Sequence, residues 1–527
     1  MTRIVTDYLN YSAEEYPENP AFCDNQRQMT YRQLQQEAFH VAMSLINRNI
    51  FKKPILIFMD KSAECIAAYM GAAYSGNFYS PLDIDMPAER IGKIVETLLP
   101  EMVVASEKCR EKAEKLFQEI PVLYYEEMQK QEVEIERIRR VENQIIDTDI
   151  LYVLFTSGST GIPKGVTVSH KSVIAYACWV KTAFGFDENT IFGNQTPFYF
   201  SMSVLDIFQT LCNGATLYII PKVLFSFPIR LLEYLNEHSI NTIYWVPTAL
   251  CQVANTRALE KRKPETLKKV LFAGEVMPAK QLNVWRKMLP DALYANLFGP
   301  TETTDICCYY VLGREIADTE SVPIGYACRN TDLLILDEDD LPVSGHDIGE
   351  LCVRGSILAS GYYRNPEKTA EVFVQNPVNP DYPEIIYRTG DLVHVNERKE
   401  LIYDSRKDFQ IKHLGHRIEL GEIEAVASGA EGVDRVCCLY HKEQKQIILF
   451  YTGTAGEEVL QSTIKSNLPV YMVPSKIKNV IVMPINANGK IDRIELGKEW
   501  ERMNEHRTSN FRKSENGGGN PSGHRKN

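Results

Sequence analysis

The feature that most constrains the fold is the alternation of strand-sized apolar runs with helix-sized amphipathic stretches. Residues 54–58 form a continuous apolar run, and residues 30–48 before it and 62–75 after it carry apolar side chains at helical spacing. We expect further strands at 149–155, 215–220, 242–245 and 269–272, and helices at 228–237 and 279–288. Strands that alternate with helices of this length are typical of parallel sheets with crossover helices, so the sequence predicts an α/β fold.

The pattern changes near residue 406, where we expect a second, smaller domain. A large α/β domain would cover residues 1–405, and a small mobile α+β domain would cover residues 406–503. Residues 504–527 contain a triple glycine and a proline, and we expect a disordered tail there. The charge-rich stretch at 107–144 is interpreted as a solvated helix face and connection.

Composition excludes several classes of protein. The 527 residues carry 58 Lys+Arg against 69 Asp+Glu, a net charge of -11 that argues against a nucleic-acid-binding surface. No apolar run approaches the roughly 20 residues that cross a bilayer, so no membrane insertion is expected. The polar start of the chain is not that of a secretory signal. Its 12 cysteines are irregularly spaced without a C-x-x-C pair, which favours buried thiols in a cytoplasmic protein.

The strongest local signal is the run TSGSTGIPKG at residues 156–165, which follows an apolar strand. Glycines let the backbone approach an anion, hydroxyls and N–H groups donate to it, and the ammonium of Lys164 can bridge phosphate oxygens. The order differs from that of a Walker A loop. By composition alone, such a loop is more often a flexible turn.

Further segments in a fixed order resemble those of the adenylate-forming superfamily, which includes amino-acid adenylation domains, acyl-CoA synthetases and firefly luciferase. These segments are NLFGPTE at 296–302, GEL at 349–351, GY at 361–362, YRTGD at 387–391, RKD at 406–408, GHRIELGEIE at 415–424 and NGKIDR at 488–493. Within the family, FAGEVMP at 272–278 resembles the stand-alone D-alanine–carrier-protein ligases. The resemblance spans residues 10–500 and implies a large adenylation domain with a small mobile C-terminal domain.

The resemblance implies ATP- and Mg²⁺-dependent activation of a small carboxylic acid as an acyl adenylate. The acyl group would then pass to the phosphopantetheine thiol of a separate carrier protein. Free coenzyme A is the alternative acceptor. A luciferase-like oxygenase and a catalytically silent relative are two further alternatives, and retention of Glu302, Asp391 and Lys490 argues against the silent one.

The family pattern also implies a role for individual residues. Lys490 would be the catalytic lysine that contacts the acyl carboxylate and the α-phosphate, and Glu302 would coordinate magnesium, a cation that prefers oxygen ligands. Lys164 would steady the pyrophosphate. Donors to phosphate oxygens would be Thr156, Ser157 and Thr301.

The remaining implied roles concern the nucleoside and the thiol. Asp391 would accept from the ribose hydroxyls with Arg406 nearby, and Tyr403 would line the ribose. Asn296 would pair with the adenine amino edge, and Phe298 would stack on the base. Leu297, Gly299 and Pro300 complete this segment. Asp408 would be the hinge between the domains, and Gly415 would line the pantetheine tunnel, where a missing Cβ leaves room.

The expected substrate pocket departs from the family pattern at one position. Activators of α-amino acids place an Asp where this chain has Ser201, and a hydroxyl cannot form the same charge-assisted bond with an ammonium. The other lining residues would be Met202, Leu205, Trp245, Leu271, Ala273, Leu297, Asp305 and Ile306.

Two kinds of substrate therefore remain. One is an aryl or aliphatic acid without an amine. The other is an amino acid, such as a β-amino acid, whose displaced ammonium meets Asp305, because a buried Asp needs a partner. Asp206 follows the pocket-facing set and is expected on a helix surface.

Overall fold

The computed structural model describes residues 2–158, 162–343, 346–407, 410–485 and 491–502 of the chain. The chain forms two compact units, of which the first extends to Glu419 and the second begins at Leu420. The boundary predicted at 405/406 is the start of the domain that is expected to move, and it stays a prediction. The predicted tail at 504–527 lies outside the described residues. No helix within the described ranges is long and apolar enough to cross a membrane.

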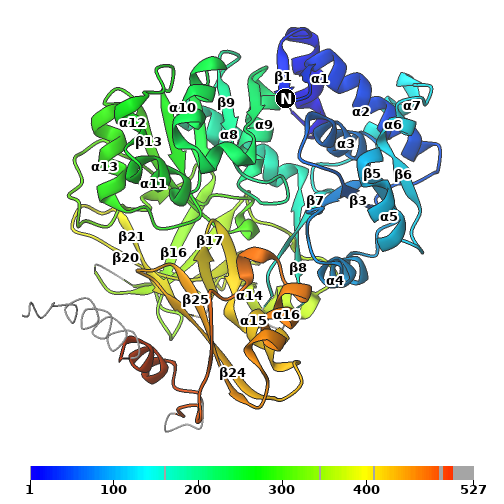
Figure 1. The fold of residues 1–527 in the computed structure, drawn as a ribbon. Coiled ribbons are helices and arrows are strands. Elements are labelled where there is room, and N and C mark those ends of the chain that lie inside the picture. Colours follow the sequence, from blue (N-terminus) through cyan, green and yellow to red (C-terminus); the bar gives the residue numbers. More distant parts are fainter. Residues whose placement is uncertain (1, 159–161, 344–345, 408–409, 486–490, 503–527) are drawn as a thin grey trace, which may run out of the picture. The chain divides into compact units, whose positions relative to one another are not determined.

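A seven-stranded sheet carries the first part of the chain (Figure 1). Its strands in spatial order are β18 (Gly361–Tyr362), β8 (Lys164–Ser169), β7 (Ile150–Thr156), β4 (Phe78–Pro81), β3 (Pro54–Phe58), β5 (Met102–Ala105) and β6 (Val122–Tyr124). From β7 to β6 all pairs are parallel, whereas β8 runs antiparallel to both β7 and β18. The five residues of β3 are all buried, as expected for a central parallel strand covered on both faces.

A nine-stranded sheet follows. Its strands in spatial order are β15 (Tyr326–Ala327), β14 (Cys308–Val311), β13 (Leu293–Phe298), β12 (Lys269–Phe272), β11 (Thr242–Trp245), β9 (Ile191–Asn194), β10 (Thr216–Ile219), β1 (Pro20–Cys23) and β2 (Gln28–Thr30). The strands from β13 to β1 are parallel, and the strands at both edges are antiparallel. Because carboxyl ends of parallel strands meet at one edge, loops after these strands can share a site.

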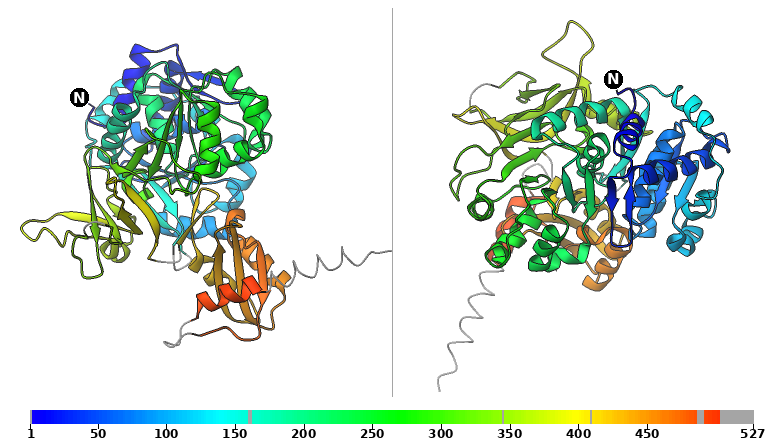
Figure 2. Two further views of the ribbon diagram at one scale, coloured as in Figure 1. Left: turned by 90° about the vertical axis from the view of Figure 1, so that its left-hand side faces the viewer. Right: turned by 90° about the horizontal axis from the view of Figure 1, so that it is seen from above.

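Helices pack beside these two sheets, with α2 and α3 near β3 and β5, and α10 to α13 near β13 (Figures 1 and 2). The helices of the first unit are α1 (Thr6–Glu15), α2 (Tyr31–Ile46), α3 (Ala63–Tyr74), α4 (Ala88–Leu98), α5 (Arg110–Leu116), α6 (Tyr125–Met128), α7 (Ile135–Glu142), α8 (His170–Phe184), α9 (Ser203–Asn213), α10 (Pro228–Glu237), α11 (Pro247–Asn255), α12 (Ala258–Lys261), α13 (Ala279–Met288) and α14 (Pro366–Val372). Short 3-10 turns are η1 (Glu107–Cys109), η2 (Lys222–Ser226) and η3 (Thr301–Thr303).

The ends of two helices follow directly from their residues. Thr30 begins α2 with a capping box, in which its hydroxyl accepts from the amide of Gln33 and the Gln33 side chain accepts from the amide of Thr30. Gly214 ends α9 at φ +68°, where a Cβ would lie 2.2 Å from the ring of Tyr16. The position therefore requires glycine for conformation and for space.

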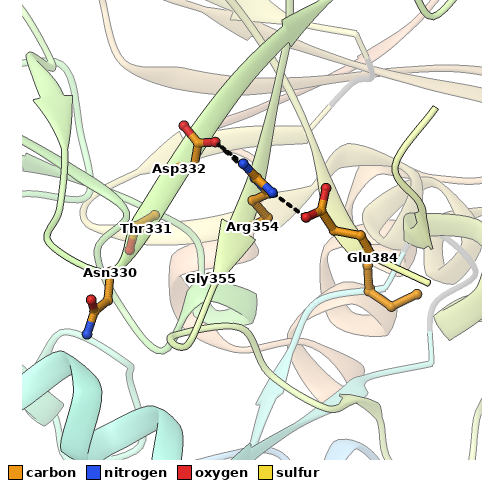
Figure 3. A pocket seen from close by; sticks show the side chains of 7 residues that line it. Asn330, Thr331, Asp332, Arg354, Gly355 and Glu384 are labelled. Atoms are coloured by element: carbon orange, nitrogen blue, oxygen red, sulfur yellow. Dashed lines mark hydrogen bonds and ion pairs between the residues drawn. The ribbon is translucent and has the colours of Figure 1, made fainter. Parts of the chain in front are cut away.

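A third, antiparallel sheet holds the last strands of this unit. It consists of β16 (Thr331–Leu336), β17 (Gly349–Gly355), β20 (Ile385–Val395), β19 (Phe373–Gln375) and β21 (Leu401–Arg406). A hollow of about 410 Å³ lies on it, where Arg354 reaches Asp332 at 2.7 Å and also pairs with Glu384 (Figure 3). None of the predicted site residues lines this hollow. The hairpin of β22 (Gln410–His413) and β23 (His416–Glu419) ends the first unit.

The second unit is a small α+β body. Its three-stranded sheet contains β24 (Val433–His441), β25 (Gln446–Gly453) and β26 (Lys476–Asn479), with α15 (Leu420–Ser428), α16 (Glu457–Asn467) and the turn η4 (Val470–Met472). Its core contains Ile448, Phe450, Leu496 and Trp500. The helix α15 and the strands β24 and β25 make this unit α+β, the class expected for the small C-terminal domain.

The predicted alternation of strands and helices is confirmed, and with it the α/β class. The helix expected at 228–237 is α10, and the strand expected at 54–58 is β3. The charged stretch at 107–144 contains three short helices but also the strand β6, which the charge pattern did not predict. Each of the twelve cysteines is a thiol, and only Cys178 is exposed, in agreement with the predicted structural role.

The capping box of α2 gives a test of local stability. We expect Thr30→Ala to destabilise the first turn of α2 by about 1 kcal/mol, because an amide donor of that turn loses its acceptor. Hydrogen exchange of residues 31–36 should accelerate several-fold. Thr182→Ala, an exposed change inside α8 where Thr182 bonds only to the carbonyl of Cys178, is the control and should leave exchange in α8 unchanged or slower. Equal exchange of α2 in the wild type and Thr30→Ala would contradict the capping role.

Candidate functional site

The glycine-rich loop joins two strands whose ends pair with one another. Thr156 is the last residue of β7, Lys164 is the first of β8, and the two face each other in the antiparallel register. The hydroxyl of Thr156 is buried and has no hydrogen-bond partner among the described residues. Buried hydroxyls are rarely left in this state, so a phosphate oxygen bound beside β7 would satisfy it.

Glu302 lies in η3 and is fully buried. Its Oε2 accepts a 2.7 Å hydrogen bond from Nη1 of Arg417, and its Oε1 accepts one of 2.7 Å from the hydroxyl of Tyr362. The ammonium of Lys164 lies 3.7 Å from Oε1 and donates to the Tyr362 hydroxyl at 3.3 Å. Three side chains, from β8, β18 and β23, therefore converge on the carboxylate of Glu302 in η3.

The charges of this cluster are unequally compensated. Burial alone would raise the pKa of Glu302, but Arg417, Lys164 and the Tyr362 hydroxyl lower that pKa to about 2, so the carboxylate is ionised. Burial lowers the pKa of Lys164, and Glu302 opposes this only in part. The closer partner of Glu302 is Arg417, at 2.7 Å against 3.7 Å for Lys164. Lys164 is therefore the cation with charge left to offer to another anion.

A second group of predicted residues lies on β13, β20 and β21. Asp391 accepts from Nη1 of Arg406 at 3.0 Å, as the resemblance implied when it placed Arg406 nearby. The rings of Phe298 and Tyr403 lie 5.8 Å apart, and the ammonium of Lys412 lies 4.3 Å from the centre of the Phe298 ring. These aromatic rings and the Asp391 carboxylate are groups that can hold a base and a ribose.

Asn296 also lies on β13, next to this group. Its Nδ2 donates to the carbonyl of Pro323 at 2.8 Å. Among the described residues no donor to its Oδ1 is found, so that oxygen could accept from an adenine amino group. Leu297 lies beside it on β13, and Gly299 and Pro300 connect the strand to η3.

The predicted acid pocket and phosphate site meet at one contact. Thr301 donates from its hydroxyl to that of Ser201 at 3.3 Å. Ser201 and Met202 precede α9, and Leu205 lies in its first turn. Most of the remaining predicted lining is buried, and it comprises Trp245, Leu271, Ala273, Leu297 and Ile306. Trp245 donates its indole N–H to the carbonyl of Gly193 at 2.8 Å, which fixes it in the core.

Asp305 is buried, with two phenol donors. Its Oδ2 accepts from the hydroxyl of Tyr176 at 2.6 Å and from that of Tyr244 at 3.1 Å. Burial raises the pKa of Asp305 to about 8, although these two hydrogen bonds oppose the rise. An acid in this state can become the partner of a substrate ammonium, because the arriving cation would favour its ionised form.

The expected position of Asp206 was wrong. It is 1% exposed, and its Oδ2 accepts from Nδ2 of Asn194 at 2.6 Å. Every residue of α9 is buried, so this helix has no solvent face that Asp206 could occupy. Burial raises the pKa of Asp206 to about 7, and the nearby Lys61 and Asn194 oppose the rise.

The hairpin of β22 and β23 contacts Glu275 and Val246. Gly415, at its turn, donates its amide to Oε1 of Glu275 at 2.7 Å, and at φ +80° its Cβ would lie 2.5 Å from Cγ1 of Val246. The space that glycine leaves is therefore already small, and the tunnel role of Gly415 stays a prediction. Lys490 and Asp408 lie outside the described residues.

Sequence reasoning named the segments but missed four contributors. Arg417 and Tyr362 were quoted within family segments without a role, although each contacts Glu302 directly. Tyr176 and Tyr244, the donors to Asp305, lie far from it in the sequence. Of these four residues, only Arg417 could have been found from the sequence. It is a cation between Gly415 and Glu419, in a segment that was expected to approach the site.

The donor set is consistent with a metal that arrives with phosphates. No group of three or more His, Cys, Asp or Glu among the described residues could hold a metal ion by itself. Magnesium is commonly held by one or two carboxylates together with substrate phosphates, and Glu302 can supply one such carboxylate. The hydroxyl of Thr156, which has no partner in the part of the chain that the structure describes, and the ammonium of Lys164 are suited to the phosphates.

Comparison with known proteins places these features in a family. The family model described as AMP-binding enzyme matches residues 9–363. Tyrocidine synthase 1 of Brevibacillus parabrevis is 31% identical over 91% of this chain and 44% of its own length, so the chain spans less than half of that relative. A D-alanine–D-alanyl carrier protein ligase of Bacillus cytotoxicus is 29% identical over 92% of this chain and 97% of its own.

A solved structure agrees with the fold. The crystal structure of IdnL1 matches with a TM-score of 0.79 and 26% identity, and it covers 92% of this chain and 98% of its own. The predicted α/β class with a large first part and a small C-terminal part is confirmed by this match.

The raised pKa of Asp305 predicts a dependence of stability on pH. The folded state holds a proton up to about pH 8, whereas the unfolded chain releases it near its ordinary pKa of 3.8. Asp305 therefore lowers stability as pH rises between these values, by about 1.4 kcal/mol per pH unit at most. Asp305→Asn should lose less stability than the wild type between about pH 5 and pH 8 in urea unfolding. The exposed change Asp85→Asn should follow the wild type, and parallel curves for all three proteins would refute the buried, protonated state of Asp305.

Proposed function

Because the chain belongs to the AMP-binding enzyme family, we propose that it activates a small carboxylic acid with ATP and Mg²⁺ and transfers the acyl group to the phosphopantetheine thiol of a separate carrier protein. The chain is an adenylate-forming ligase. The acid, the metal, the nucleotide and the acceptor belong to the proposal. We place the reaction in the cytoplasm, where ATP is available and thiols stay reduced.

One observation carries the first half-reaction. The hydrogen bond between Thr301 and Ser201 brings a proposed phosphate donor against a proposed wall of the acid pocket. Attack of a carboxylate on the α-phosphate requires two anions to meet, so positive charge must be fixed beside them. Lys164 is a cation that Glu302 compensates only in part, and Lys490 would supply a second one. Thr156 and Ser157 would donate to the phosphate oxygens, and Glu302 would hold the metal.

The nucleoside would lie across β13, β20 and β21. In the proposal Asp391 accepts from the ribose hydroxyls while Arg406 holds the carboxylate in place. Phe298 and Tyr403 supply the aromatic faces for the base and the ribose, and Asn296 accepts from the adenine amino group. The carboxylate, the aromatic pair and the amide lie on neighbouring strands of two sheets, which supports one continuous binding surface.

A carrier protein is favoured as acceptor by a relative that matches over nearly its full length. That protein is named as a D-alanine–D-alanyl carrier protein ligase, and the match covers 97% of it and 92% of this chain. Free coenzyme A remains the alternative, because it presents the same pantetheine arm. The thiolation roles of Asp408 and Gly415 belong to this part of the proposal.

Two substrate classes follow from the pocket. Ser201 replaces the usual amine-binding Asp, so an amine-free aryl or aliphatic acid fits the pocket with a neutral hydrogen bond at this position. An acid with an amine displaced from the α position fits if its ammonium reaches Asp305, whose buried carboxyl lacks a cationic partner in its hydrogen bonds to Tyr176 and Tyr244.

Pyrophosphate exchange tests the proposed chemistry. With a panel of α-amino, β-amino, aryl and short aliphatic acids, we expect at least one acid to drive exchange of labelled pyrophosphate into ATP. Lys490→Ala should lower the exchange rate about 100-fold or more, because a fixed cation at the reacting phosphate is lost. Lys498→Ala, an exposed lysine of the same unit, is the control. Unchanged exchange by Lys490→Ala would show that the catalytic assignment is wrong.

Asp305 separates the two substrate classes. If the substrate carries a displaced amine, Asp305→Ala should abolish exchange with that acid, since the ammonium would enter a buried site without a counter-charge. Exchange with an amine-free acid should stay within a few-fold of the wild type. The opposite pattern would exclude the amine-bearing class.

A further inference from the structure

The side-chain amide of Asn296 is held in one orientation by a backbone carbonyl. Its Nδ2 donates to the carbonyl oxygen of Pro323 at 2.8 Å, and Asn296 is buried. A carbonyl oxygen can only accept, so the nitrogen of the amide, and not its oxygen, must face Pro323. The oxygen Oδ1 is then the amide atom that remains for a ligand. Whatever fixes the Pro323 carbonyl therefore fixes which hydrogen-bonding group Asn296 offers.

The backbone that carries this carbonyl is tied to the start of β21. The amides of Ile324 and Gly325 donate to the carbonyl oxygen of Leu401 at 2.9 and 3.2 Å. The amide of Leu401 donates back to the carbonyl of Gly325 at 3.1 Å. Because these three bonds follow directly after Pro323 in the chain, the position of its carbonyl depends on where β21 begins.

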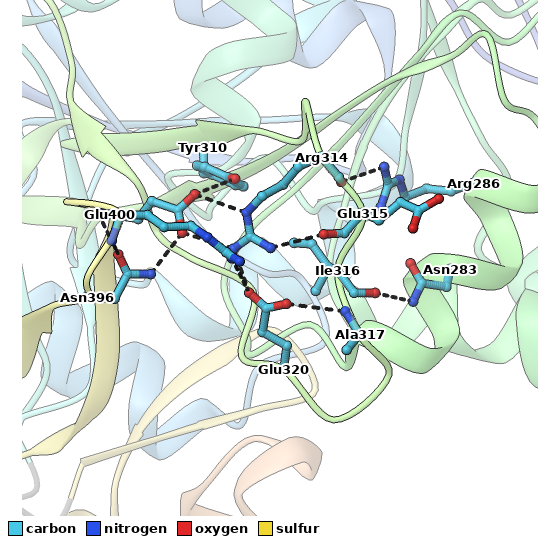
Figure 4. Close-up of polar contacts among 11 residues, drawn as sticks. Asn283, Arg286, Tyr310, Arg314, Glu315, Ile316, Ala317, Glu320, Asn396 and Glu400 are labelled. Atoms are coloured by element: carbon cyan, nitrogen blue, oxygen red, sulfur yellow. Dashed lines mark hydrogen bonds and ion pairs between the residues drawn. The ribbon is translucent and has the colours of Figure 1, made fainter.

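The residue before Leu401 is a buried glutamate with several partners (Figure 4). Glu400 accepts from the hydroxyl of Tyr310 at 2.7 Å and from Nδ2 of Asn396 at 2.8 Å. Arg314 reaches both of its oxygens, with Nη2 at 3.0 Å from Oε2 and Nε at 3.3 Å from Oε1. A buried carboxylate without a cation is costly, so the pair with Arg314 restricts where Glu400 and the backbone beside it can lie.

Arg314 belongs to the same loop as the carbonyl that orients the amide. This loop, residues 312–325, joins β14 to β15 and contains Pro323. Arg314 also pairs with Glu320 of the loop, and Arg286 of α13 donates to the carbonyl of Arg314 at 2.7 Å (Figure 4). The ion pair with the buried glutamate thus links this loop to the strand on which it rests.

We propose that the Arg314–Glu400 ion pair determines the base specificity of the nucleotide site. It holds the Pro323 carbonyl in place, and this carbonyl keeps the amide of Asn296 turned to accept from the 6-amino group of adenine. The inference rests on the proposed function for the location of the base beside Asn296. A 6-oxo purine presents an acceptor at the same position, so it would face Oδ1 without a hydrogen bond. Arg314 and Glu400 are positioning residues, because they act on the base through other groups.

Loss of the pair would change specificity in a way that general loosening of the fold would not. If the Pro323 carbonyl is displaced, the amide of Asn296 can rotate by half a turn and donate to a 6-oxo group. Affinity for an adenine nucleotide then falls relative to that for a hypoxanthine nucleotide. A variant that merely loosens the site lowers both affinities together, since both nucleotides carry the same ribose and phosphate. The ratio of the two affinities is therefore the quantity to measure.

Binding of AMP and IMP tests the inference. The full-length protein is titrated with each nucleotide by isothermal titration calorimetry. IMP differs from AMP only in the purine, which has a 6-oxo group in place of the 6-amino group and a proton on N1. We expect the wild type to prefer AMP by about tenfold or more, and Arg314→Gln to reduce this preference to about threefold or less. Arg314→Lys keeps the charge and should reduce the preference less than Arg314→Gln does.

A second arginine offers a matched control (Figure 3). Arg354 also bridges two carboxylates, those of Asp332 and Glu384, but it lies at a hollow that none of the predicted site residues lines. Arg354→Gln should leave the ratio of AMP to IMP affinity unchanged. Glu400→Gln keeps the shape of the partner and removes its charge, so it tests the same pair from the other side and should lower the ratio as Arg314→Gln does.

The Asn296→Ala background shows whether the pair acts through the amide. Asn296→Ala should itself bring the ratio of AMP to IMP affinity close to one, and Arg314→Gln added to it should change the ratio no further. If the wild type binds AMP, an unchanged ratio in both Arg314→Gln and Glu400→Gln, or a further fall in the double variant, would overturn the inference and leave the proposed function standing. A wild type that binds neither nucleotide would refute the proposed function and the inference together.

Discussion

The described part of the site is organised by the need to compensate one buried negative charge. Glu302 is fully buried, and its carboxylate contacts side chains from β8, β18 and β23, which are separated by up to 253 residues of sequence. A carboxylate in this environment fixes which elements must come together, because removal of its cations would leave a costly unpaired charge. The start of β8, η3 and the hairpin are thus positioned by electrostatics as much as by the apolar core beneath them.

The sequence was sufficient for the framework and for one pair within consecutive family segments. The helical spacing at 30–48 identified α2, because that signal was local. Asp391 and Arg406 could be placed near one another in advance because the family segments that contain them follow one another in a fixed order. This contact joins the neighbouring strands β20 and β21.

Partners across the fold could not be predicted in the same way. Asp206 was expected on a surface because helices usually have one, but α9 is buried on all sides, so helical spacing carried no information on its exposure. The donors to Asp305 come from α8 and β11, and no local pattern links them to it. Arg417 stood in a quoted segment, yet its partner depends on how the hairpin packs, which periodicity and motif order leave undetermined.

The two cations beside Glu302 bear on what the site can attract. Arg417 lies 2.7 Å from one oxygen of Glu302, and Lys164 lies 3.7 Å from the other. Glu419 supplies a second carboxylate whose charge also acts on Lys164. Because Arg417 forms the shorter contact, Lys164 is the side chain that an arriving phosphate can engage while the buried carboxylate of Glu302 keeps a cation.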